Sequence, residues 1–124
     1  MLIGVDIGTS AVKIVLVDDD EAVVADAELQ LHPTRPKPLW SEDDPDAWWR
    51  ALCDGLDKLA ADAPQAMSGV TAIGLSGQMH SLVALDAEDR PVRPAILWND
   101  GRSHAEAAEL AGLGLDLQRR TGVL

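Results

Sequence analysis

The chain has 124 residues, 47% of them hydrophobic and 25% charged, which is typical of a globular domain that buries a core. Its 21 acidic and 10 basic residues give a net charge of −11 at pH 7, which argues against the basic surface that nucleic-acid-binding proteins need. The single cysteine, Cys53, excludes an internal disulfide and a cysteine-based metal cluster. No apolar run approaches the roughly 20 residues of a membrane span, and the N-terminus does not resemble a signal segment. We therefore expect one cytoplasmic domain with no membrane or nucleic-acid partner.

The first third of the chain predicts an antiparallel meander. Residues 2–7 and 12–17 are apolar and β-branched and are joined by a short turn, as in a hairpin. After the polar turn DDDE, residues 22–32 alternate in hydrophobicity and predict a third strand. The connections are too short for crossovers, so the three strands should be antiparallel. Residues 33–38 contain three prolines and predict a loop.

Residues 41–63 predict the longest helix. Asp44 fits the N-cap and Pro45 the first helical position. Four large apolar residues share one face at spacings of three and four: Trp48, Leu52, Leu56 and Leu59. Gly55 weakens the helix by about 1 kcal/mol relative to alanine. We therefore expect packing, rather than intrinsic propensity, to hold this helix.

The second half predicts a mixed sheet. Residues 69–77 are apolar and bounded by glycines, which predicts a buried strand parallel to the first one, because a helix precedes it. Residues 80–86 and 93–98 predict strands around the turn AEDRPV, and a second helix follows with Asp100 as its candidate cap. The tail predicts a further helical piece. The order β-β-β-α-β predicts an α/β fold and resembles the opening of the ribonuclease-H-like topology of the actin and sugar-kinase ATPase superfamily.

The first candidate site is the stretch VDIGTS. Gly8 can adopt backbone angles closed to other residues, and the amides and hydroxyls of Thr9 and Ser10 suit anionic oxygens. Asp6 beside them could hold Mg²⁺, which takes oxygen ligands. Lys13 follows on the next strand as a weaker phosphate candidate, since a strand lysine is usually solvated. The alternative is equally strong for the isolated motif: Asp6 is a turn acid and the hydroxyls satisfy local backbone groups.

The second candidate site combines two later motifs. Gln78, Met79 and His80 follow a strand end, where open α/β sheets bind ligands, and they suit a small polyol. Taken singly, His80 is more often a structural histidine and Met79 a core residue. The second motif brings an aromatic ring, an amide, a carboxylate and a guanidinium together: Trp98, Asn99, Asp100 and Arg102. Helix capping by Asp100 and a surface ion pair with Arg102 would explain the last two but not the first two.

The stretches GVDIGTSAVK, PLWSEDDPDAWW, LSGQMHS and PAILWNDGRS together resemble the FGGY family of carbohydrate kinases, in order and spacing over essentially the whole chain. The resemblance is closest to the family's xylulokinases. It implies transfer of the γ-phosphate of ATP to D-xylulose with Mg²⁺. It also implies roles for three groups of residues: catalysis and metal binding for Asp6; phosphate or nucleotide binding for Gly8, Thr9, Ser10 and Lys13; sugar binding for Gln78, Met79, His80, Trp98, Asn99, Asp100 and Arg102. Ala11 and Ser81 replace glycines that are common in the family, and both are small.

Other interpretations stay open. Glycerol kinases of the family carry an Arg-Glu pair in place of Met79 and His80, which disfavours glycerol, whereas gluconate kinases share the Met-His pair. A non-catalytic sugar-binding module, a two-metal nuclease and an inert fold are alternatives of other classes.

Family members are several times longer than this chain. Their catalytic aspartate and their adenine-binding domain come after the region that residues 1–124 resemble. We therefore expect residues 1–124 to be part of the N-terminal kinase domain, truncated and inactive alone. Sheet surface that the longer proteins bury should be exposed here, so we also expect self-association.

Overall fold

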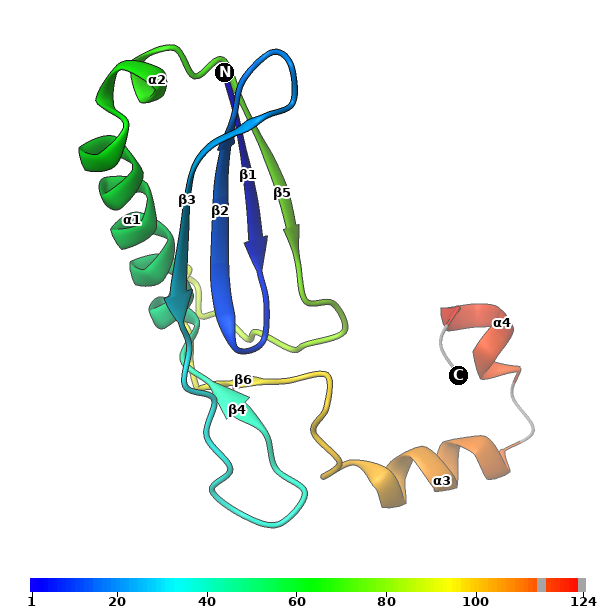
Figure 1. The fold of residues 1–124 in the computed structure, drawn as a ribbon. Helices are drawn as coiled ribbons and strands as arrows, with labels where there is room; N and C mark the ends of the chain where they lie inside the picture. Colours follow the sequence, from blue (N-terminus) through cyan, green and yellow to red (C-terminus); the bar gives the residue numbers. More distant parts are fainter. Residues whose placement is uncertain (114–115, 123–124) are drawn as a thin grey trace.

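The computed structural model describes residues 1–113 and 116–122, and its centre is a mixed sheet of four strands in the order β3-β2-β1-β5 (Figure 1). The strands are β1 (Leu2–Ile7), β2 (Ala11–Val17), β3 (Val23–Gln30) and β5 (Ala72–Gly77). The pairs β1–β2 and β2–β3 are antiparallel, whereas β1 and β5 are parallel. The predicted meander and the predicted parallel strand are therefore confirmed, with small differences at the strand ends.

Helix α1 (Pro45–Asp62) packs on one face of this sheet. As predicted, Asp44 is the N-cap and accepts a hydrogen bond from the Asp46 amide at 3.0 Å, while Pro45 opens the first turn. The core between helix and sheet contains Ile3, Val5, Val12, Ile14, Leu16, Ala27, Leu31, Ala51 and Leu59. Burial of these side chains supplies the main stabilising free energy of the fold.

Gly55 allows α1 to pack closely on the sheet, a role that its low helix propensity does not indicate. A Cβ atom at this position would lie 2.6 Å from Ile14 Cδ1 and 2.8 Å from Leu29 Cδ2. The absence of a side chain therefore lets α1 lie close to β2 and β3. The unfavourable propensity of glycine is offset by this close contact, in agreement with a helix held by packing.

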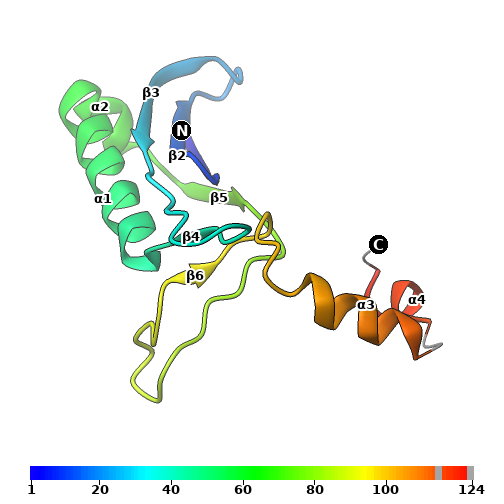
Figure 2. The ribbon, with the colours of Figure 1, turned by 90° about the horizontal axis from the view of Figure 1, so that it is seen from below.

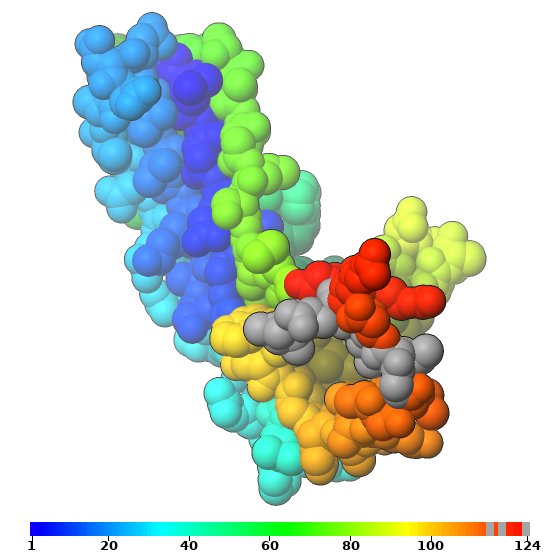
Figure 3. Space-filling model, turned by 90° about the vertical axis from the view of Figure 1, so that its right-hand side faces the viewer, coloured from blue at the N-terminus to red at the C-terminus, as the bar shows by residue number. Residues whose placement is uncertain are grey.

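Strand β5 differs from its prediction because every one of its residues is exposed. Helix α1 covers β2 and β3, while β5 forms the edge of the sheet with β1 as its neighbour. Figure 3 shows this strand, in green, along the sheet edge with its surface open. The apolar side chains of Ile73 and Leu75 are consequently exposed. The expectation of a buried strand was wrong for these 124 residues, because no described element packs over it.

The strands predicted at 80–86 and 93–98 are mostly absent from the described structure. Strand β6 (Ala95–Ile96) pairs with β4 (Glu42–Asp43), a strand that was not predicted. The rest of this arm, which projects from the body in Figure 2, has two isolated bridges, Leu82 with Ile96 and Leu85 with Pro91. Pro91 and Pro94 lack the amide protons that a longer ladder requires.

The remaining helices are α2 (Pro64–Ser68), α3 (His104–Gly112) and α4 (Leu117–Thr121). The residue at the N-cap of α3 is Ser103, so the interpretation of Asp100 as its cap was wrong. Helix α3 has no buried residue and extends away from the sheet (Figure 1). Within the described ranges, none of the helices combines the length and apolar character needed to cross a membrane.

Candidate functional site

The turn between β1 and β2 presents two amides to the outside. The Gly8 amide donates to the Ala11 carbonyl at 3.0 Å, and a Cβ on Gly8 would lie 3.0 Å from the same oxygen. Gly8 does not have a positive φ, so close backbone approach, rather than an unusual backbone angle, explains the glycine. In the described part of the chain, the Thr9 and Ser10 amides donate no hydrogen bond. These two N–H groups are therefore free to bind an anion.

Asp6 lies near the end of β1, on the sheet face opposite α1. Its neighbours in the ladder are Lys13 on β2 and Ser76 on β5, and the three residues border a hollow of about 410 Å³. The Asp6 side chain is exposed and forms no ion pair with any described residue. The Lys13 ammonium instead lies 3.6 Å from the carboxylate of Glu28. Asp6 is thus an accessible carboxylate close to the predicted phosphate-binding turn, and Lys13 is paired with Glu28.

A free carboxylate beside open amides fits the way proteins hold Mg²⁺. This ion is commonly bound by one or two carboxylates together with phosphate oxygens and water. The described residues contain no group of three or more His, Cys, Asp or Glu side chains arranged as a metal site. The donor set around Asp6 therefore suits Mg²⁺ that arrives with a phosphorylated ligand rather than an independent metal centre.

The residues after β5 form a second hollow. Gln78 continues the strand pairing, since its amide donates to the Ile7 carbonyl at 2.8 Å. Met79 is 72% exposed, and His80 adopts a φ of 64°, a left-handed conformation that is uncommon outside glycine. A cavity of about 430 Å³ is lined by Gly77, Gln78, Met79, His80 and Trp98. This volume and this mixture of apolar walls and polar groups suit a small polar ligand.

Trp98 lines this cavity, whereas Asn99, the next residue in the chain, is not among the lining residues. Trp98 is 58% exposed, and its amide donates to the Ser81 hydroxyl at 3.2 Å. Asn99 is exposed beside it, and no described residue forms a hydrogen bond with its side chain. The structure therefore brings Trp98 to the predicted polyol-binding residues Gln78, Met79 and His80, which lie 18 to 20 positions earlier in the sequence.

Thr9 connects the β1–β2 turn to two of the residues that line the second cavity. The Trp98 indole Nε1 donates to Thr9 Oγ1 at 3.0 Å, and Thr9 Oγ1 donates to Gln78 Oε1 at 3.1 Å. The turn that can bind an anion and the cavity that can bind a polyol are therefore adjacent. This link was not predicted, because a tryptophan and a threonine far apart in the sequence leave no local pattern.

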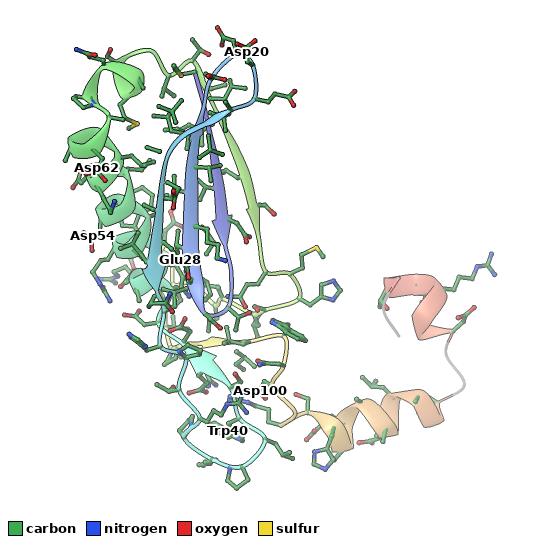
Figure 4. All side chains as sticks on the ribbon, in the orientation of Figure 1. Asp20, Glu28, Trp40, Asp54, Asp62 and Asp100 are labelled. Atoms are coloured by element: carbon green, nitrogen blue, oxygen red, sulfur yellow. The ribbon has the colours of Figure 1, made fainter. Side chains whose placement is uncertain are left out.

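Asp100 and Arg102 lie in a buried cluster instead of at the cavity wall. The Asp100 side chain is 2% exposed and accepts hydrogen bonds from the Ser41 amide at 2.6 Å and from Arg102 Nε at 2.8 Å. Arg102 also bonds Glu42 at 2.8 Å and stacks on the ring of Trp40. Figure 4 shows Asp100 and Trp40 together below the sheet. The predicted ion pair between Asp100 and Arg102 is present, but it does not lie at the surface, because the two side chains are only 2% and 14% exposed.

Electrostatics within this cluster follow from its hydrogen bonds. The Arg102 guanidinium beside Asp100 holds the pKa of that carboxyl well below its usual range, and the pKa of Arg102 is raised in return. Trp40, Ser41 and Glu42 were not singled out from the sequence. The one available signal was the polar stretch SEDD, in which Ser41, Glu42 and Asp43 are all buried directly before α1.

Comparison with known proteins points to one family. The sequence model of the "FGGY family of carbohydrate kinases, N-terminal domain" matches residues 1–124. The xylulose kinase of Escherichia coli K12 is 47% identical over 110 residues, which are 89% of this chain and 22% of that protein. A solved "xyloylose kinase" from Brucella ovis is 51% identical with a TM-score of 0.84, over 87% of this chain and 23% of the other.

A solved gluconate kinase from Lactobacillus acidophilus is 30% identical with a TM-score of 0.86, over 98% of this chain and 25% of the other. The chain thus spans about a quarter or less of the length of these relatives. The expected fold is confirmed, because the mixed α/β sheet matches sugar kinases of the actin and hexokinase type. The chain belongs to the FGGY family of carbohydrate kinases.

Proposed function

We propose that residues 1–124 form the part of an ATP-dependent sugar kinase that binds the nucleotide phosphates and one side of the sugar, with D-xylulose as the sugar. The observation that carries the proposal is the position of the 430 Å³ cavity directly beside the turn with two unpaired amides. Relatives described as xylulose kinases support the choice of sugar. We place the reaction in the cytoplasm, with ATP and the sugar as partners of this site.

The cavity offers complementary contacts to a sugar. The exposed imidazole of His80 and the amide of Gln78 can exchange hydrogen bonds with hydroxyl groups. Met79 and Trp98 supply apolar surface for the carbon skeleton. Asn99 follows Trp98 in the chain and is exposed, so we include its amide as a further candidate hydrogen-bonding group.

The turn offers contacts to phosphate. The amides of Thr9 and Ser10 would donate to phosphate oxygens, and Asp6 would hold Mg²⁺ directly or through water. When bound, Mg²⁺ neutralises charge on the transferring phosphoryl group. In a chain with a net charge of −11 this local neutralisation is essential. Lys13 can reach phosphate only by leaving Glu28, so its predicted role is the weakest of the group.

The catalytic base is the group that residues 1–124 do not supply in this proposal. Asp6 is assigned to the metal, and Asp100 is buried with its oxygens committed to Ser41 and Arg102. Phosphoryl transfer requires a base within hydrogen-bond reach of the sugar hydroxyl. We therefore expect no phosphorylation by the 124-residue chain alone. Production of ADP that depends on D-xylulose, in an assay of the purified chain, would overturn this expectation.

Titration calorimetry with D-xylulose tests the sugar site, with D-gluconate as the comparison. His80→Asn removes the imidazole but keeps a residue that tolerates the left-handed conformation at this position. We expect D-xylulose to bind and His80→Asn to weaken that binding. His32→Asn, at an exposed histidine outside this cavity, is the matched control and should bind normally. If D-gluconate binds more tightly than D-xylulose, gluconate is the better candidate substrate. Equal losses of affinity in His80→Asn and His32→Asn would contradict a sugar site at His80.

A further inference from the structure

We propose that Thr9 is a positioning residue for the part of the cavity wall formed by Trp98 and Gln78. Its hydroxyl orients the Trp98 indole and the Gln78 amide, while its backbone amide is left for phosphate. This inference rests on the proposed function, because it divides the predicted phosphate role of Thr9 into two parts. It concerns three side chains from three separate segments of the chain, the β1–β2 turn, the end of β5 and the segment after β6.

The hydrogen-bonding capacity of the three groups fixes the direction of each bond. An indole nitrogen only donates, so Thr9 Oγ1 accepts from Trp98 Nε1 at 3.0 Å. The Gly8 carbonyl only accepts, and it lies 3.4 Å from Gln78 Nε2. Gln78 therefore turns its Oε1 toward Thr9, where it accepts the hydroxyl proton at 3.1 Å. The single proton of Thr9 is committed to Gln78.

This commitment changes what Thr9 can offer to a phosphate group. A hydroxyl has one proton, so a phosphate oxygen could receive it only after Gln78 released it. The Thr9 amide has no such competition, since no described residue accepts from it. Replacement of the side chain should consequently disturb the cavity wall and spare the amide contact to phosphate.

The hydroxyl matters because little else holds the Trp98 side chain. Trp98 is 58% exposed, and its other hydrogen bond among the described residues is donated by its main-chain amide to Ser81 Oγ. An exposed tryptophan without a fixed indole would sample other rotamers and leave the cavity wall undefined. The bond to Thr9 selects the rotamer in which the ring lines the cavity.

The direct test is proton–nitrogen NMR of the indole groups in the 124-residue chain. The chain has four tryptophans, and Trp98→Phe identifies the Trp98 signal. Thr9→Val keeps the shape and removes the hydroxyl, so it should shift the Trp98 indole signal and leave the signals of Trp40, Trp48 and Trp49 in place. Thr9→Ser should restore the wild-type position. Thr71→Val, which removes a hydroxyl bonded to the Met1 carbonyl, is the matched control. An unmoved Trp98 signal in Thr9→Val overturns the proposal.

Ligand titrations of the same variants separate positioning from phosphate binding. Thr9→Val should weaken D-xylulose about fivefold, the loss expected for one net hydrogen bond, and should leave the affinity for Mg²⁺-ATP unchanged. Weaker Mg²⁺-ATP binding with unchanged sugar binding would overturn the proposal, because it would assign the hydroxyl to phosphate. If the wild-type chain binds neither ligand, the proposed function fails for the isolated chain, and the dependence of the Trp98 signal on Thr9 still decides the positioning role.

Discussion

The guanidinium of Arg102 lies over the ring of Trp40, with its central carbon 3.7 Å from the ring centroid. The same group donates hydrogen bonds to Asp100 and Glu42, and Arg93 also pairs with Glu42. The cluster joins the loop before α1 to the segment that carries Trp98. It therefore holds the segment that carries Trp98, although none of Trp40, Asp100 and Arg102 lines the cavity.

Arg102→Lys should destabilise the chain although it preserves the charge. Lysine cannot stack a planar group on Trp40 or donate two parallel hydrogen bonds to Asp100, and we expect a loss of about 2 kcal/mol. Urea unfolding followed by circular dichroism measures the free energy of unfolding. As a control, Arg50→Lys alters an exposed ion pair with Asp44 and should change the free energy of unfolding by less than about 0.5 kcal/mol. Equal losses in the two variants would contradict a special role for Arg102.

The cluster also predicts a pH dependence. The pKa of Asp100 is lowered mainly by its hydrogen bonds with Arg102, so the folded state binds this proton less readily than the unfolded state. The stabilisation is complete at pH values above the pKa of this carboxyl in the unfolded state, which is about 4. It is lost as the pH falls toward the pKa in the folded state. The stability difference between wild type and Asp100→Asn should therefore shrink below about pH 4. A difference that stays constant in urea titrations across this range would refute the interpretation.

Gly55→Ala tests the close contact of α1 with the sheet. Alanine gains about 1 kcal/mol in helix propensity, but its Cβ would press on Ile14, which is fully buried, and on Leu29. Overpacking typically costs about 1–3 kcal/mol, so we expect a net loss in stability. The double variant Gly55→Ala with Ile14→Val removes the Ile14 Cδ1 atom that the new Cβ would contact. It should therefore recover part of the stability that Gly55→Ala loses.

Gly112→Ala in α3 is the control for this substitution. A Cβ at Gly112 would meet no atom within 4 Å. This variant should be neutral or slightly more stable in the same unfolding measurement. A stabilising Gly55→Ala would show that the core can adapt and that the contact is not restrictive.

The open edge at β5 predicts self-association of the 124-residue chain. Ile73 and Leu75 expose apolar surface next to unpaired strand groups, a combination that favours pairing with another copy. Sedimentation velocity should show a concentration-dependent increase in size, which Leu75→Lys abolishes. Leu39→Lys, at an exposed leucine in a loop, should leave it unchanged. A monomer at all concentrations would contradict self-association through the edge strand β5.

The features that were predictable from sequence are local ones. Asp44 and Pro45 specify the start of α1 because a cap and a first turn involve neighbouring residues. The hairpin of β1 and β2 has only three residues between its strands, so its pairing follows from short-range pattern.

The features that were predicted wrongly depend on contacts between residues far apart in the sequence. The apolar run of β5 indicated burial, but burial depends on which element covers the strand, and among the described residues nothing does. Asp100 looked like a helix cap because it precedes α3, whereas its partner Ser41 comes from a loop 59 positions earlier. Neither relationship has a local signature.

The hydrogen bond from Trp98 to Thr9 closes a loop of 89 positions, and that separation has a consequence for folding. The hairpin that carries Thr9 needs only local contacts and can form early, whereas closure of a long loop costs entropy that must be repaid by later contacts. We therefore expect the cavity wall to form later than the β1–β2 hairpin. In refolding experiments, the hairpin should recover before the Trp98 environment does.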